Sequence, residues 1–185
     1  TLPVLMKLYD ENKIELDKKI SYYLPELKDS NKKNCTINDL LLHQAGLKAF
    51  IPFYEEAIDE NSVNGKLMSN KKDEVYSLQV DQNTFANKNY TYKANYISNT
   101  KDSLHTLSIA DSLFIISSFK DSIWQQIIDS PVNTKNKKYL YSDLSFLILQ
   151  KIIEKVAKKP LDELVISYFY NELGANNTCF NPLQQ

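Results

Sequence analysis

The stretch YSDLSFLILQKIIEKVA, residues 141–157, carries the clearest secondary-structure pattern in the chain. Its apolar residues recur every three or four positions, which is the spacing of one face of an α-helix. These residues are Leu144, Leu147, Ile148, Ile152 and Val156. We therefore predict a helix at Asp143–Ala157 and work outward from it.

The flanking sequence predicts further helices. Pro3 suits the first turn of a helix over 2–12, and a short amphipathic segment follows up to Pro25. Thr36 is a good N-cap for a helix over 37–44, with Asp39 completing a capping box and Gly46 as the left-handed residue that closes it. Two more helices are expected, at 119–129 and from Pro160 to about residue 171. Since no segment alternates strand and helix, we expect a mainly α fold.

The chain divides by composition into residues 1–60, 61–102 and 103–185. The middle part is rich in Asn, Lys, Ser and Tyr, and its apolar residues follow no sustained helical or strand period. Two interpretations therefore stay open for it: short strands, or an ordered excursion of the chain. Its aromatic residues argue against disorder. After it, Asp111 lies three residues beyond Ser108 and is expected to cap a helix.

Composition excludes several classes of function. The 185 residues are 43% hydrophobic and 24% charged, as in an ordinary globular domain. Only three glycines occur, and no glycine-rich phosphate loop is present. The basic residues are all lysine and the net charge is −1, which argues against a nucleic-acid partner. No apolar run approaches the ~20 residues that span a bilayer, and no signal peptide is visible.

Cys35 and Cys179 have neither the spacing nor the histidine neighbours of a zinc site. Two separate thiols are the simpler expectation, and a disulfide between them is the alternative. No metal or cofactor is expected.

Three stretches together resemble the serine β-lactamase and penicillin-binding-protein-like superfamily, in its class C and esterase-related branch. Residues 4–17 with Tyr23-Leu-Pro-Glu26 resemble the helix after the nucleophile and the segment following it. TINDLLLHQAGL at 36–47 is similar to the family's TIxxLLxHxSGL, and residues 141–154 are similar to YSNxxYxxLxxIIE. The sequence around His43 also resembles a subgroup fused to a family-three glycoside hydrolase domain.

The resemblance implies acyl transfer. In the family, a serine of a Ser-x-x-Lys motif attacks a carbonyl, and a Tyr-x-Asn element transfers protons nearby. Tyr141 would take the proton-transfer role, and Asp143 a role in substrate binding or in the hydrogen-bond network. An ionised aspartate cannot donate a hydrogen bond as asparagine does. This difference favours an esterase or a D-amino-acid peptidase over a β-lactamase.

The resemblance also implies that this chain is the helical lobe of a larger domain. The Ser-x-x-Lys nucleophile would lie just before Thr1, and a Lys-Thr-Gly-like strand beyond Gln185. Four internal Ser-x-x-Lys matches are close to what chance gives. They are Ser30/Lys33, Ser69/Lys72, Ser98/Lys101 and Ser117/Lys120. We therefore expect the isolated chain to be inactive; a non-catalytic binding or scaffold homologue is the alternative.

The expected setting is the bacterial cell envelope, with a small-molecule or peptidoglycan-like substrate and a possible dimer through exposed apolar surface. Tyr141 should lie at an open surface. His43 is expected to be a structural histidine, His105 a surface or loop residue, and Tyr168 and Phe169 core residues.

Overall fold

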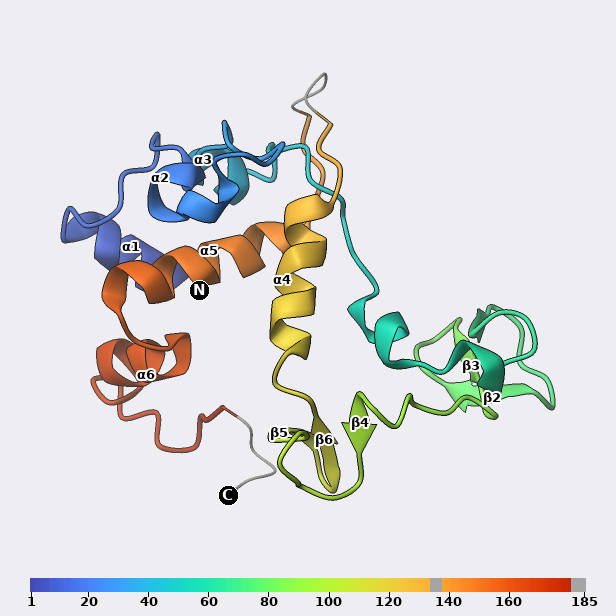
Figure 1. Cartoon of the computed structure of the whole chain (residues 1–185). Helices are drawn as coiled ribbons and strands as arrows, with labels where there is room; N and C mark the ends of the chain where they lie inside the picture. Colours follow the sequence, from blue (N-terminus) through green and yellow to red (C-terminus); the bar gives the residue numbers. More distant parts are fainter. Residues whose placement is uncertain (134–137, 181–185) are drawn as a thin grey trace. The chain divides into compact units, whose positions relative to one another are not determined.

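The computed structural model describes residues 1–133 and 138–180 (Figure 1). The chain forms two compact units. One comprises Thr1–Ile51 and Trp124–Gln185, and the other comprises Pro52–Ile123.

The first unit is helical. Its elements are α1 (Leu2–Asp10), α2 (Ile20–Tyr23), the short 3₁₀ turn η1 (Pro25–Leu27), α3 (Ile37–Leu41), most of α4 (Phe119–Asp129), α5 (Asp143–Ala157), α6 (Leu161–Val165) and the π-helical turn η4 (Ile166–Tyr170). The predicted bounds of α4 and α5 are confirmed.

The core of this unit forms around α5, which packs against α1, α2, α3 and α6 (Figure 1). The apolar face predicted from the sequence supplies the buried side chains of Leu144, Ile148 and Ile152. Burial of each such side chain contributes about 1.5–3 kcal/mol. The start of α5, where Ser142 is the N-cap residue, is thereby fixed to the core.

The N-terminus of α3 has the predicted capping box. The Thr36 hydroxyl accepts a hydrogen bond from the Asp39 amide at 3.0 Å, and the Asp39 carboxylate accepts one from the Thr36 amide at 3.0 Å. The helix ends at Leu41, earlier than expected, because His43 adopts a left-handed conformation with φ of 52°. Gly46 is also left-handed, as predicted, with φ of 72°.

The C-terminal end of α4 is bound by a buried lysine. Lys32 is 0% exposed, and its Nζ donates to the carbonyl oxygens of Ile128 at 2.9 Å and Ser130 at 2.6 Å, and to Oδ1 of Asn31 at 2.9 Å. A cation at this position satisfies carbonyls that have no partner within the helix. Burial lowers the pKa of Lys32 to about 8.

The second unit contains two small antiparallel sheets. In the first, β3 (Phe85–Asn87) lies between β1 (Met68–Ser69) and β2 (Tyr76–Gln79). In the second, β6 (Leu113–Ile115) lies between β4 (Ile97–Ser98) and β5 (Leu107–Ala110). Two 3₁₀ turns, η2 (Phe53–Ala57) and η3 (Glu60–Ser62), precede them.

A small apolar cluster supports the second sheet. Ala57, Ile97 and Ile115 are buried, and Tyr96 and Phe119 pack against them with their rings 5.9 Å apart. Residues 61–102 lie within this unit and form β1 to β4, one of the two conformations left open by the sequence.

The predicted mainly α class is wrong: helix accounts for 37% of the structure and strand for 12%. The strands are only two to four residues long, so they leave no period-two pattern in the sequence. Asp111 does not cap a helix, because it lies in the turn between β5 and β6, where Ser112 has φ of 52°. Across residues 1–133 and 138–180, no helix has both the length and the apolar character needed to cross a membrane.

Candidate functional site

Two segments that lie far apart in the sequence are hydrogen-bonded to each other in the helical unit. They are residues 42–49, which follow α3, and residues 139–143, which lead into α5. The Leu140 amide donates to the carbonyl of His43 at 3.0 Å, and the Asp143 amide donates to the carbonyl of Ala49 at 3.0 Å. The structure therefore joins two of the three stretches on which the family resemblance rests.

His43 and Ser142 link these segments through their side chains. The backbone amide of Ser142 donates to Nδ1 of His43 at 3.1 Å, and the Ser142 hydroxyl donates to the carbonyl of Lys48 at 2.5 Å. Ser142 is only 1% exposed. His43 is thus a hydrogen-bonded structural histidine, as predicted, although its partner lies 99 residues away.

Gly46 gives the loop a close approach to Asn133. The Asn133 amide donates to the Gly46 carbonyl at 2.8 Å. A Cβ atom at Gly46 would lie 2.3 Å from the carbonyl oxygen of Asn133, well inside van der Waals contact. Both this contact and the positive φ require glycine here.

Tyr141 and Asp143 flank the buried Ser142 and are both exposed. The Tyr141 side chain is 56% exposed, which confirms the prediction of an open surface. A hydrogen bond to the Asp143 carboxylate, reinforced by its negative charge, raises the pKa of Tyr141. The pair therefore favours the protonated form of Tyr141, whose hydroxyl can donate a hydrogen bond.

Sequence reasoning missed Ser145, one turn after Tyr141. It is 1% exposed, and its hydroxyl has no hydrogen-bond partner among the described residues. A buried hydroxyl is usually hydrogen-bonded, so this one is an exception close to the candidate site. In the sequence it is indistinguishable from the many other serines of the chain.

The internal Ser-x-x-Lys matches lack the geometry of a nucleophile and its base. All four pairs are described, and in none is the serine hydroxyl hydrogen-bonded to the lysine three residues on. Ser98 ends strand β4, and its hydroxyl lies 3.3 Å from that of Thr100. Ser117 lies in the turn before α4.

His105 lies in a loop, as predicted, but it is buried and not at the surface. It is 5% exposed, and its Nδ1 lies 2.9 Å from Oδ2 of Asp102. Hydrogen bonds from the His105 amide, the His105 ring and the Leu104 amide lower the pKa of Asp102 to about 2. A turn brings residues 102 and 105 together, which gives His105 an acidic partner that the sequence did not predict.

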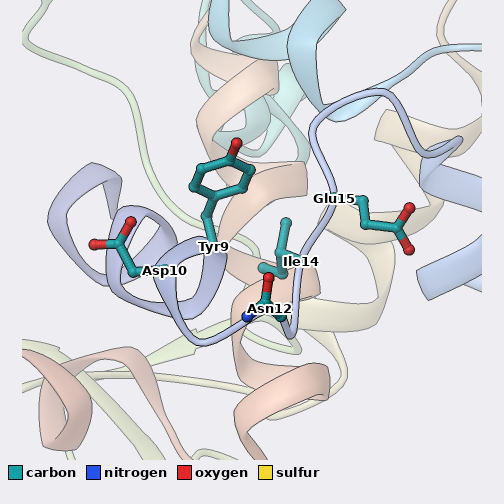
Figure 2. Close-up of a pocket in the computed structure, with 5 residues that line it drawn as sticks. All are labelled: Tyr9, Asp10, Asn12, Ile14 and Glu15. Atoms are coloured by element: carbon teal, nitrogen blue, oxygen red, sulfur yellow. The ribbon is translucent and has the colours of Figure 1, made fainter.

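An open pocket of about 480 Å³ lies at the end of α1 and the loop that follows. Tyr9, Asp10, Asn12, Ile14 and Glu15 line it. Figure 2 shows the Asp10 and Glu15 carboxylates pointing to opposite sides, so they do not form one acidic site. Neither Tyr141 nor Asp143 contributes to it.

The remaining sequence predictions concern metals, cysteines and aromatic residues. Within the described ranges no three His, Cys, Asp or Glu side chains come together as metal ligands would. Cys35 is buried and Cys179 exposed, with no disulfide between them. Tyr168 and Phe169 are half-buried and not fully in the core, and Lys7 lies 5.1 Å from the centre of the Tyr168 ring.

Comparison with known proteins places this geometry in a family. A family model described as beta-lactamase matches residues 2–185. The chain therefore belongs to the β-lactamase family, within the superfamily of serine β-lactamases and penicillin-binding proteins.

Particular relatives agree with this assignment. Two proteins provisionally named D-alanyl-D-alanine carboxypeptidase, from Salmonella agona and Salmonella typhimurium, are 27% identical to the chain over 188 residues. The alignment covers 98% of this chain and 31% of each relative, so the chain spans about a third of their length. The crystal structure of FmtA from Staphylococcus aureus has a similar fold, with a TM-score of 0.50 at 20% identity over 92% of this chain and 31% of that one.

Proposed function

We propose that this chain forms the Tyr-x-Asp side of the active site of a serine hydrolase that cleaves an amide bond in a peptidoglycan-type substrate through an acyl-serine. The observation that carries the proposal is the exposed Tyr141–Asp143 pair, held at the start of α5 by the buried Ser142. The family match supports the acyl-serine chemistry.

Each residue takes a role that its surroundings favour. Tyr141 passes a proton to the leaving amine as the acyl-serine forms, while the lysine of the Ser-x-x-Lys motif takes the proton of the attacking serine and returns one to Tyr141, so that no tyrosinate is left. Residues outside the 185 supply the nucleophile, a serine of a Ser-x-x-Lys motif, because the internal matches are not built for it. The isolated chain is then inactive.

The Asp143 carboxylate favours a peptide over an ester. An ionised carboxylate accepts hydrogen bonds, and the N–H of a peptide substrate can donate one whereas an ester has no such group. The names of the Salmonella relatives point the same way. Carboxypeptidase action on a D-amino-acid peptide is therefore our first choice, and the esterase and β-lactamase alternatives rank below it.

The cell envelope is the setting that such a substrate requires. A fused glycoside hydrolase domain and a dimer are further proposals for the intact protein. The dimer is supported by exposed apolar side chains on both segments of the site, Leu42 on one and Leu140 on the other.

The test uses the protein expressed from its complete gene and a peptide ending in D-alanyl-D-alanine. Tyr141→Phe removes only the hydroxyl and should lower kcat by about 10²–10⁴-fold, the range for loss of a general acid. Tyr139→Phe is the matched control, because Tyr139 is a nearby tyrosine that is 67% exposed, and it should leave kcat unchanged.

Release of D-alanine by Tyr141→Phe at the wild-type rate would contradict the proton-transfer role. A wild-type protein that releases none and is not acylated by penicillin would favour the non-catalytic alternative.

A further inference from the structure

The hydrogen bond between His43 and Ser142 fixes the protonation state of the imidazole. A backbone amide can only donate, so Nδ1, which lies 3.1 Å from the Ser142 nitrogen, must accept. The ring is therefore neutral and carries its proton on Nε2. A second proton on Nδ1 would abolish the bond.

Segments 42–49 and 139–143 are joined by several hydrogen bonds. Among those of the described residues, Nδ1 of His43 is the single acceptor that belongs to a side chain. The other acceptors are the backbone carbonyls of His43, Lys48 and Ala49, which cannot be titrated. The four donors are the amides of Leu140, Ser142 and Asp143 and the hydroxyl of Ser142, and these residues surround Tyr141 in the sequence. Loss of the bond to His43 would leave the Ser142 amide without its partner, and the segment would then be held by the Leu140 and Asp143 amides and the Ser142 hydroxyl.

The imidazole also packs against aromatic rings of the opposite segment. Its centre lies 4.7 Å from that of Tyr141, 5.7 Å from that of Phe146 and 5.9 Å from that of Tyr139. Packing alone would be retained by a phenyl ring, whereas the acceptor would not. The two roles of His43 can therefore be separated by substitution.

We propose that His43 is a positioning residue that sets the Tyr141–Asp143 pair by accepting the Ser142 amide proton, and that it does so only as the neutral Nε2–H imidazole. The role in catalysis rests on the proposed function; the hydrogen bond and its protonation state do not. The titratable side chains that pack against the ring are Tyr139 and Tyr141, and Asp143 is hydrogen-bonded to Tyr141. Lys48 lies on the same loop as His43.

Two substitutions separate the hydrogen-bond acceptor of His43 from its aromatic ring. In His43→Asn, Oδ1 can take the place of Nδ1, and asparagine tolerates the left-handed φ of 52°. His43→Phe keeps an aromatic ring and removes the acceptor. Hydrogen exchange of the Ser142 amide, measured by NMR on the 185-residue chain, should accelerate about tenfold in His43→Phe and stay near the wild-type rate in His43→Asn.

Nitrogen NMR of the wild-type imidazole supplies a readout that needs no variant. It should show Nδ1 unprotonated and Nε2 protonated in the folded chain. A proton on Nδ1 of the folded wild type, or equal exchange rates in the two variants, would overturn the proposal.

Activity of the complete gene product tests the consequence for the site. His43→Phe should lower kcat about tenfold or more with KM unchanged, because the proton donor is displaced, and His43→Asn should restore it. An inactive wild-type protein would refute the proposed function, while the NMR measurements would still decide whether His43 holds Ser142 as stated.

Discussion

Gly46 and Gly174 allow the close contact at the candidate site to be measured against a matched control. Both glycines belong to the helical unit and both are left-handed, with φ of 72° and 61°. A Cβ at Gly174 would meet nothing within 4 Å, whereas one at Gly46 would lie 2.3 Å from the Asn133 carbonyl oxygen. Alanine at either position therefore carries the cost of a left-handed Cβ, but only alanine at position 46 also collides with Asn133.

The expected magnitudes follow from the two environments. Gly174→Ala should lower the free energy of unfolding by about 1–2 kcal/mol, the cost of a left-handed Cβ. Gly46→Ala carries the same cost and must also displace Asn133, which breaks the 2.8 Å hydrogen bond between them and adds about 1 kcal/mol or more. The total should be about 2–4 kcal/mol.

Urea unfolding followed by tryptophan fluorescence measures the difference. The chain has one tryptophan, Trp124, and it lies in the same unit as both glycines. An equal loss of stability in the two variants would refute the argument that Asn133 leaves no room for a side chain at Gly46.

Two further predictions concern titration. Asp143→Asn should lower the pKa of Tyr141. The substitution removes the carboxylate that accepts a hydrogen bond from the Tyr141 hydroxyl, and with it the negative charge that disfavours ionisation of the tyrosine. Ultraviolet titration, with Tyr141→Phe subtracted in each background, measures this shift, and an unchanged or higher pKa would contradict the pairing. Lys32 has a pKa of about 8 in the folded protein against 10.5 for an ordinary lysine, so the unfolded chain binds more protons between these values. Its contribution to stability should therefore increase as the pH rises from about 8 to 10.5. Relative to wild type, Lys32→Met should lack that increase in unfolding measurements across this range, and parallel pH profiles would show that Lys32 is fully charged throughout.

The helices that the sequence predicted well are those with strong local patterns. The bounds of α4 and α5 follow from apolar residues at helical spacing and from breaking residues such as Pro131. The capping box of Thr36 and Asp39 is also local, since its four groups lie within four residues. Such signals need no information about the rest of the chain.

The features that sequence reasoning missed depend on turns or on distant contacts. The β5–β6 hairpin turns at Ser112, a residue with no marked preference for positive φ, and its strands are too short to show alternation. The Asp102–His105 pair forms because Asp102 accepts two backbone amides in a turn. No local pattern reports either arrangement.

The candidate site shows the same division. The Tyr141-Ser142-Asp143 motif was identified by resemblance, and the exposure of Tyr141 was expected from it. The hydrogen bonds from Ser142 to His43 and Lys48 join residues more than 90 positions apart, and only the fold brings these together. The protonation state of His43 follows from that contact and could not be derived from the sequence.

Mapping of the acylated residue tests the central claim most directly. The protein expressed from its complete gene is labelled with a fluorescent penicillin, digested, and analysed by mass spectrometry, with the isolated 185-residue chain treated in parallel. We predict one labelled serine, in a Ser-x-x-Lys motif outside residues 1–185, and no labelling of the isolated chain. Stoichiometric labelling of a serine within the chain, such as Ser98, would contradict the account.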